Sequence, residues 1–227
     1  DTRDSDGRTA LHHAAAAGHA ELVTVLVQRG AKTNTLDDGK WSPLHSAAAA
    51  GHALACSALL AAGADQSIEA GAGSSGSTAL ILAASKGRAT VVRTLLGAGA
   101  STEAVDGSGA SALHRAAGKG HLEIVEALLE GGGSAAATLL DARDREGHTA
   151  FHAAAVHEQA AACVLLAEKG AALDTTNLAG EAPKALLTPS LCSHLGLADE
   201  DEEMADHTDW LNASFPVQPP PNTSNKA

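Results

Sequence analysis

Apolar residues recur along this chain in two alternating patterns. A short Ala-rich stretch follows a phrase of Thr or Ser, then usually Pro or Ala, then Leu or Phe, and in most copies a His. In the longer stretch that comes next, Leu, Val and Ile recur at the three- and four-residue spacing of one helical face. Both stretches end at a Gly in most copies, which closes a helix cheaply because Gly adopts a left-handed backbone without a Cβ clash. The sequence therefore predicts pairs of helices, the first short and the second longer.

The paired patterns repeat with a fixed period. From Leu11 to Leu44 is 33 residues, and from Leu80 to Leu113 is again 33. A period of this length indicates one supersecondary unit stacked on itself, with a long surface and no built-in catalytic pocket. The copies of the phrase are Thr9–His12, Ser42–His45, Thr78–Ile81 (which lacks the His), Ser111–His114 and Thr149–His152. We therefore expect an all-α stack of about five units.

Each unit is expected to open at an Asp and to cap its first helix with the Thr or Ser hydroxyl. The first helices are predicted at Leu11–Ala17, Leu44–Ala50, Leu80–Ser85 and Leu113–Gly118. Two insertions, at 71–76 and around 133–139, disturb the period and are expected in loops that join units. Glu158 replaces the Gly that separates the two helices of the fifth unit, so that turn should be strained or differently shaped.

The repeat domain is predicted to span residues 1–196. A sixth unit begins at Asn177 and then loses the pattern, so residues of about 178–196 should form a degenerate C-terminal cap. From 197 to 227 an acidic run is followed by four prolines, a composition that cannot bury enough apolar surface to fold. We expect a disordered tail there, and we read its Asp209–Leu211 and Phe215 as part of an ordinary disordered end rather than as a short binding motif.

Composition narrows the classes of partner. Of 227 residues, 44% are hydrophobic but only 2% are aromatic, which suits thin Ala-rich helices that pack closely. The formal net charge of -12 makes nucleic acid and anionic membranes poor partners and a basic protein surface a more plausible one. No apolar run is long enough to cross a membrane, and no secretory signal is visible. Because the chain starts at Asp1 without Met, we expect it to be a fragment.

The three cysteines suggest neither a disulfide framework nor a zinc site, because their number is odd and no CxxC spacing occurs. We interpret Cys56 and Cys163 as small core residues and Cys192 as a tail thiol. A reducing compartment, the cytoplasm or the nucleus or both, is the matching location.

The order of Asp, Gly, Thr-Pro-Leu-His, Ala-Ala, Gly-His, Leu-Leu and Gly-Ala in these units resembles the ankyrin repeat over residues of about 4–190. The resemblance implies helix-loop-helix units with projecting β-turn fingers. It also implies a curved solenoid whose concave side, made of fingers and first helices, binds protein partners. We expect a monomer without cofactor or metal.

Some stretches are similar to one class of ankyrin protein, the assembly chaperones of the proteasome regulatory particle. They include Asp6–His12, Gly39–His45 and Ala112–Gly120. The resemblance implies that the concave face holds the C-terminal domain of a triple-A ATPase subunit, with basic residues facing acidic ones of that domain. Arg8 and Lys86 match two such basic positions. The alternative is a generic ankyrin scaffold or adaptor for another protein.

Three further residues are candidates for partner binding. Trp41 lies between a finger and its first helix, and Trp is favoured at the centres of interfaces. Arg115 and Lys119 are four residues apart on one helical face and could extend the basic strip begun by Arg8 and Lys86. The plainer interpretation is packing for the Trp and solvated charges for the basic residues, since an exposed ion pair contributes only ~0.2–1 kcal/mol.

No catalytic site is expected. His12, His45, His114 and His152 recur once per unit, as a structural role predicts, and each should bond the neighbouring unit's loop rather than a metal. The string Gly71-x-Gly73-x-x-Gly76 lacks the strand and βαβ unit of a dinucleotide site. A catalytic function would require a domain outside this sequence.

Overall fold

In a computed structural model that describes residues 1–71 and 76–195, the predicted helical pairs are stacked in chain order. The chain divides into two compact parts, Asp1–Leu187 and Thr188–Ala227. The first part contains the array of repeats. Of the second, the described part contains α12 (Pro189–His194), where Cys192 lies. The expected tail at 197–227 lies outside the described residues.

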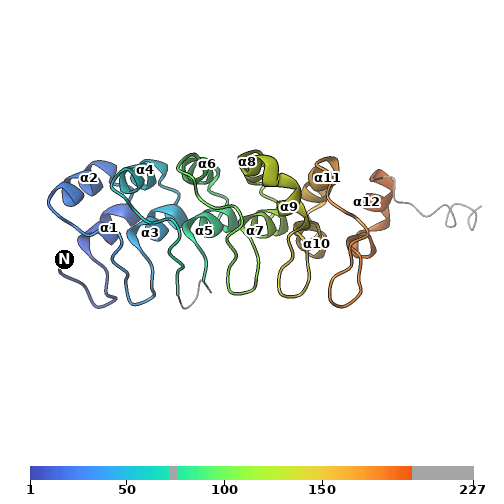
Figure 1. The fold of residues 1–227 in the computed structure, drawn as a ribbon, viewed down its shortest axis with the longest axis horizontal. Coiled ribbons are helices and arrows are strands. Elements are labelled where there is room, and N and C mark those ends of the chain that lie inside the picture. The colour runs from blue at the N-terminus through green and yellow to red at the C-terminus, as the bar shows by residue number, and fades with distance from the viewer. Residues whose placement is uncertain (72–75, 196–227) are drawn as a thin grey trace, which may run out of the picture. The chain divides into compact units, whose positions relative to one another are not determined.

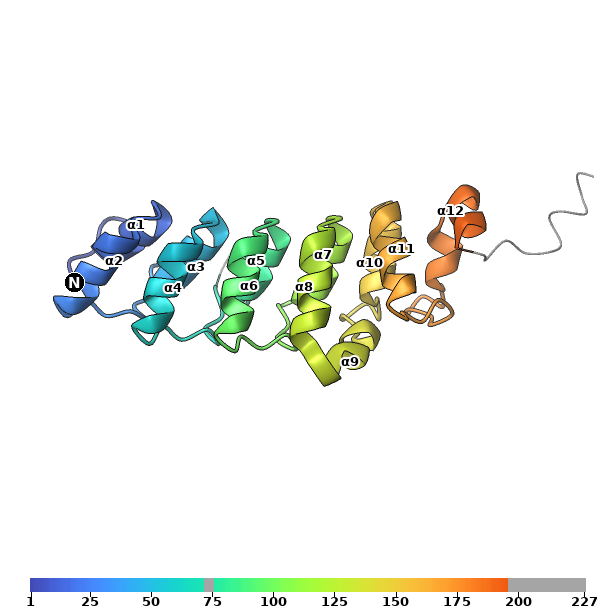
Figure 2. The ribbon, with the colours of Figure 1, turned by 90° about the horizontal axis from the view of Figure 1, so that it is seen from above.

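Five pairs make up the array (Figures 1 and 2). We call the first helix of each pair inner and the second outer. The inner helices are α1 (Ala10–Ala16), α3 (Pro43–Ala50), α5 (Ala79–Ser85), α7 (Ala112–Gly118) and α10 (Ala150–Val156). The outer helices are α2 (Ala20–Gln28), α4 (Ala53–Ala61), α6 (Ala89–Gly97), α8 (Leu122–Gly132) and α11 (Ala160–Glu168). Each inner helix packs against the next inner helix, and each outer helix against the next outer one.

The loops before the inner helices project together to one side of the array, as the lower edge of Figure 1 shows. We call these loops fingers. Neighbouring fingers are joined by backbone hydrogen bonds, as where Asp38 N donates to Asp6 O and Arg145 N to Ser108 O. The only bridge of β type within the described part of the chain links Val105 and Ser111, so the architecture is all-α as expected.

Small side chains let the inner helices approach closely. Ala15, Ala48, Ala84 and Ala117 occupy the same position in four units and are fully buried. Phe151 takes the Leu position of the fifth unit with 1% exposure. Cys56 and Cys163 are buried core residues, as predicted, and burial raises the pKa of their thiols to about 12 and about 11.

The repeated histidines tie each unit to itself and to its neighbour. The Nδ1 atom accepts the backbone N–H three residues earlier: Thr9 N to His12 (3.1 Å), Ser111 N to His114 (3.3 Å) and Thr149 N to His152 (3.1 Å). Because Nδ1 must offer a lone pair there, the proton lies on Nε2. That N–H then donates to the next finger, from His12 to Trp41 O (2.9 Å), His114 to His148 O (2.9 Å) and His152 to Glu181 O (3.2 Å). The structural role predicted for these three is confirmed.

His45 makes only half of this arrangement. Its Nδ1 accepts from Ser42 N at 3.2 Å, but its buried Nε2 has no hydrogen-bond partner. The next finger is the one lengthened by the insertion at 71–76, and its backbone groups at Ile68 and Ser77 lie near the ring without completing a hydrogen bond to Nε2. The prediction of a bond from each imidazole to the next loop is therefore wrong for His45.

The second insertion forms a helix rather than the loop that the sequence suggested. A 3-10 turn (Gly133–Ala135) continues α8, and α9 (Ala136–Asp141) follows it. Leu139 and Leu140 are 2% and 7% exposed, so this apolar pair anchors the insertion. The first insertion is described only at its ends, because residues 72–75 lie outside the described part.

The turn between inner and outer helices is left-handed in every unit. Gly18, Gly51, Gly87 and Gly120 have φ between 70° and 96°, and Glu158 keeps the same conformation with φ 56°. A side chain in this region costs roughly 1–3 kcal/mol. The expected strain at Glu158 is confirmed, while the shape of the turn is retained.

The sixth unit, which begins at Asn177, opens as the others do and then shortens. Asn177 Oδ1 accepts from Ala179 N and Glu181 N, as the Asp of the other fingers does. A 3-10 turn (Pro183–Leu186) that packs on α10 replaces the inner helix.

At the other end, the first unit exposes apolar side chains that later units bury. Leu22 is 45% exposed, whereas its equivalents Ala55, Val91, Ile124 and Ala162 are at most 1% exposed. The same face exposes Val25 at 45%. The first outer helix therefore contributes less burial to stability than its successors.

We predict that acidification weakens the array through the four histidines. Burial lowers the pKa of His12, His45, His114 and His152, opposed by the backbone groups near each ring, so the folded state binds protons less readily than the unfolded chain. Their contribution is complete above the unfolded pKa of about 6.5 and is lost as the pH falls toward the lowered folded values. Urea unfolding from about pH 8 to about pH 5 should show a nearly constant free energy of unfolding down to about pH 7 and a drop below it.

The control for that series is His19→Gln, since His19 is exposed, and its pH profile should match the parent. His114→Gln should give a shallower profile. A parent profile that is flat through the histidine range would contradict the prediction.

We also predict unequal costs for truncating equivalent positions in two units. Ile124→Ala should lower the free energy of unfolding by about 2–5 kcal/mol, as for a buried aliphatic residue. Leu22→Ala should cost about 1 kcal/mol or less, because nearly half of its surface is already in water. Chemical denaturation of both variants measures this, and equal losses would mean that Leu22 is covered in solution.

Candidate protein-binding face

Four of the fingers are shaped by the Asp that opens them, namely Asp4, Asp37, Asp106 and Asp144. Asp4 Oδ1 accepts Asp6 N at 3.0 Å and Arg8 N at 2.8 Å, and Asp144 Oδ1 accepts Glu146 N and His148 N, both at 2.9 Å. These bonds, that from Arg8 N foremost, hold the pKa of Asp4 below its usual value. Because the turns are fixed by their own side chains, the finger tips present a rigid row of side chains.

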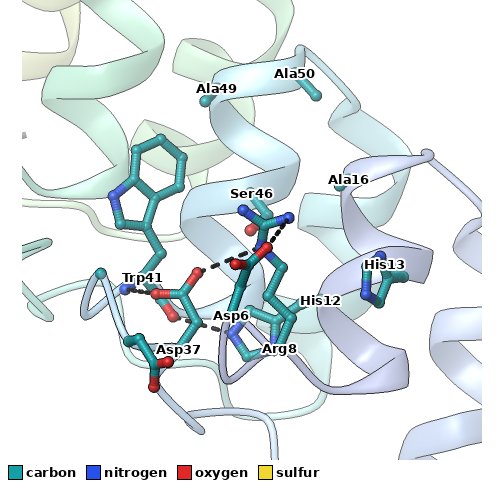
Figure 3. A pocket seen from close by; sticks show the side chains of 12 residues that line it. Asp6, Arg8, His12, His13, Ala16, Asp37, Trp41, Ser46, Ala49 and Ala50 are labelled. Atoms are coloured by element: carbon teal, nitrogen blue, oxygen red, sulfur yellow. Dashed lines mark hydrogen bonds and ion pairs between the residues drawn. The ribbon is translucent and has the colours of Figure 1, made fainter. Parts of the chain in front are cut away.

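A groove of about 630 Å³ lies between the fingers and inner helices of the first two units (Figure 3). Small residues of α1 and α3, Ala16, Ala49 and Ala50, form its apolar floor. Charged residues of the fingers form its rim. The groove can therefore receive a protein segment with an apolar side chain flanked by polar ones.

Arg8 and Trp41, two of the predicted residues, both line this groove. Arg8 Nη1 is 3.4 Å from Asp6 Oδ2, and its Nε is 3.8 Å from Asp37 Oδ2. The backbone of Trp41 is held at both ends, by Asp37 Oδ1 (2.8 Å) and by the imidazole of His12 (2.9 Å). The half-buried indole lies 6.2 Å from the ring of His45 and lines the groove.

Arg115 and Lys119 line a second groove, of about 490 Å³, between the fourth and fifth units. Arg115 Nε donates to Asp106 Oδ2 at 2.8 Å, and its Nη2 donates to Ser108 Oγ at 3.0 Å. The Asp106 side chain is only 2% exposed. Burial raises its pKa, but the bonds from Ser108 and Arg115 outweigh that effect and lower the pKa overall. Arg115 thus has a structural task, the neutralisation of a buried carboxylate.

Lys86 lies apart from both grooves. It is exposed at the C-terminal end of α5, and it forms no ion pair with any residue in the described ranges. The five predicted residues therefore fall in three places: Arg8 with Trp41, Arg115 with Lys119, and Lys86 alone. Their role in partner binding stays a prediction.

Arg88 was missed by the sequence reasoning. It takes the place that His19, His52 and His121 occupy after the left-handed Gly of other units, so it is the fully charged member of that series. Comparing the units position by position would have revealed it.

The described residues contain no group of His, Cys, Asp and Glu side chains arranged to hold a metal ion. No helix within the described ranges combines the length and apolar character that crossing a membrane requires.

Comparisons with known proteins agree with this architecture. A family model for ankyrin repeats (three copies) matches at residues 1–70, 30–106 and 80–177. The chain is also similar to the ankyrin repeat domain of Bcl-3, a member of the IκB protein family, in its crystal structure. That likeness has a TM-score of 0.76 and 26% sequence identity, and it covers 86% of this chain and 84% of the other.

A shorter likeness links the chain to a proteasome protein. Over 40 residues it is 55% identical to the 26S proteasome non-ATPase regulatory subunit 10 of Homo sapiens, and equally so to that of Mus musculus. The match covers 18% of this chain and spans only 18% and 17% of the lengths of these curated relatives. Because the ankyrin model matches well over half of the chain, the protein belongs to the ankyrin-repeat family.

Proposed function

We propose that this protein is an assembly chaperone of the proteasome regulatory particle, which holds the C-terminal domain of a triple-A ATPase subunit. An ankyrin array is a protein-binding scaffold and is typically not enzymatic. The bound domain would lie along the fingers and inner helices. The observation that carries this proposal is the 55% identity over 40 residues to the human regulatory subunit.

The binding face supports the proposal because it offers both apolar and charged contacts. The groove at Trp41 offers an indole and an Ala floor for an apolar side chain of the partner. Lys86 and Lys119 offer exposed cations for acidic side chains. Their separation along the array suits an extended protein surface rather than a small molecule.

A second candidate function is that of a scaffold or adaptor for an unrelated protein. It is favoured by the length of the Bcl-3 likeness, 86% of the chain, against the 18% covered by the proteasome relative. Both candidates place a monomer in the cytoplasm, the nucleus or both.

The test is a pull-down of the full chain with the C-terminal domain of each regulatory ATPase. We expect one domain to bind, and Arg8→Glu with Lys86→Glu to weaken that binding about tenfold or more, since two attractive pairs become repulsive. Isothermal titration gives the dissociation constants.

The matched control reverses Arg29 and Lys169, which are exposed at the C-terminal ends of the outer helices α2 and α11. It changes the net charge equally and should leave binding within about twofold. If no ATPase domain binds the parent chain, the chaperone role is lost. Recovery of a different partner by affinity mass spectrometry, without proteasome subunits, would favour the scaffold.

A further inference from the structure

The turns between inner and outer helices form a continuous edge of the array, opposite in each pair to the finger that leads into it. We call this the turn edge and define it by the residues on either side of the left-handed position of each unit. They are Ala17 and His19, Ala50 and His52, Lys86 and Arg88, Lys119 and His121, and His157 and Gln159.

Successive turns touch along this edge. Each residue after a Gly lies against the Gly of the preceding unit, so a Cβ placed there would meet it. At Gly51 that Cβ would be 2.9 Å from Arg88 Cδ, and at Gly87 it would be 2.9 Å from His121 Cε1. Arg88 is further held by the bond from its Nε to Ala49 O at 3.3 Å. The third and fourth turns therefore form one continuous surface, on which Arg88 and His121 are held by contacts with the preceding turns.

This surface is cationic in a protein with a net charge of -12. Lys86, Arg88 and Lys119 are exposed, and no carboxylate of residues 1–71 or 76–195 lies within ion-pair distance of them. The acidic residues nearest in sequence to the edge are Glu21, Glu123 and Glu158, and Glu123 is already paired with Arg93. Arg8 and Arg115 differ from them, because these two are paired with carboxylates of the fingers. Lys119 also lines the second groove, but it has no such pair within the described residues.

That difference decides which cations can contribute most to the binding of an acidic partner. A carboxylate that approaches Arg8 or Arg115 must displace an existing ion pair, and at Arg115 it would leave the buried Asp106 uncompensated. A carboxylate that approaches Lys86, Arg88 or Lys119 displaces no ion pair with a carboxylate of the described residues. We propose that the turn edge of the third and fourth units, through these three residues, is the docking site for an acidic segment of a partner protein.

The proposal rests on the protein-binding role given above, but not on the partner's being a proteasome subunit. It adds Arg88 to the residues of the charge recognition and gives Lys86, Arg88 and Lys119 the larger share of it. The grooves then supply apolar contacts, while the turn edge selects the acidic segment.

These cations also have a structural reason to be where they are. Lys86 and Lys119 follow the last residues of α5 and α7, and Arg88 covers the end of α3, where the negative end of a helix dipole favours positive charge. A structural role alone would change stability on substitution and leave binding untouched. The experiment therefore measures both.

The first probe is a labelled ten-residue oligoglutamate, titrated with the full chain at low salt and followed by fluorescence anisotropy. The triple variant Lys86→Glu, Arg88→Glu and Lys119→Glu should lose roughly tenfold or more in affinity, because each exposed ion pair is worth a factor of about 1.5 to 5. The matched triple variant Arg29→Glu, Lys32→Glu and Lys169→Glu should stay within about twofold. Thermal unfolding confirms that each variant is folded.

The second probe is the ATPase domain recovered in the pull-down, measured with the same variants. Loss of oligoglutamate binding in the matched triple as well, or its retention in the turn-edge triple, would overturn the proposal. Equal binding of a single-stranded RNA of the same length would overturn the assignment to a protein segment. If oligoglutamate binds at the turn edge but no ATPase domain binds, the chaperone role fails while this site stands; the reverse result removes the site alone.

Discussion

A neutral imidazole shared between two backbone segments is the interaction on which the stacking depends. In His12, His114 and His152 one ring nitrogen caps the helix of its own unit and the other binds a carbonyl of the next finger. The same side chain therefore sets the start of a helix and the distance to its neighbour. The third unit has the buried Ile81 in this place, and His45 before it leaves Nε2 without a partner. The junctions on either side of the third unit thus lack the imidazole bridge and rely more on apolar packing, so local opening should start there.

Charge serves two purposes, one at each end of the inner helices. The Asp residues of the fingers accept backbone N–H groups, and two of them also hold an Arg, so these finger charges are largely compensated within the array. The turn edge carries cations without such compensation. The charges that hold the structure are therefore different from those that recognise a partner. Such an interface can keep its shape in the absence of a partner and still attract one.

The sequence was sufficient for the architecture because every determinant of the unit is local and repeated. The Thr or Ser cap, the left-handed Gly and the period of 33 residues predicted the helical pairs and their ends within one or two residues. The sequence failed where the period breaks. The helix α9 forms because Leu139 and Leu140 pack on an apolar surface that no local pattern specifies. The missing hydrogen bond of His45 depends on a loop some 30 residues away. The candidate residues were found by type, but their ion pairs were not. That Asp106 is buried beneath Arg115 follows from how a finger folds against its inner helix, which composition and spacing do not contain.

The glycines of the turn edge make the order of the units matter. Each one has a left-handed backbone and also contacts a side chain of the following unit. The contacts are His52 with Gly18, Arg88 with Gly51, His121 with Gly87 and Gln159 with Gly120. A unit moved to another place in the array would keep its own conformation, but its turn would contact a different side chain. Near-identical units are therefore not freely exchangeable, and an engineer who reorders them must move each Gly together with the side chain that packs on it.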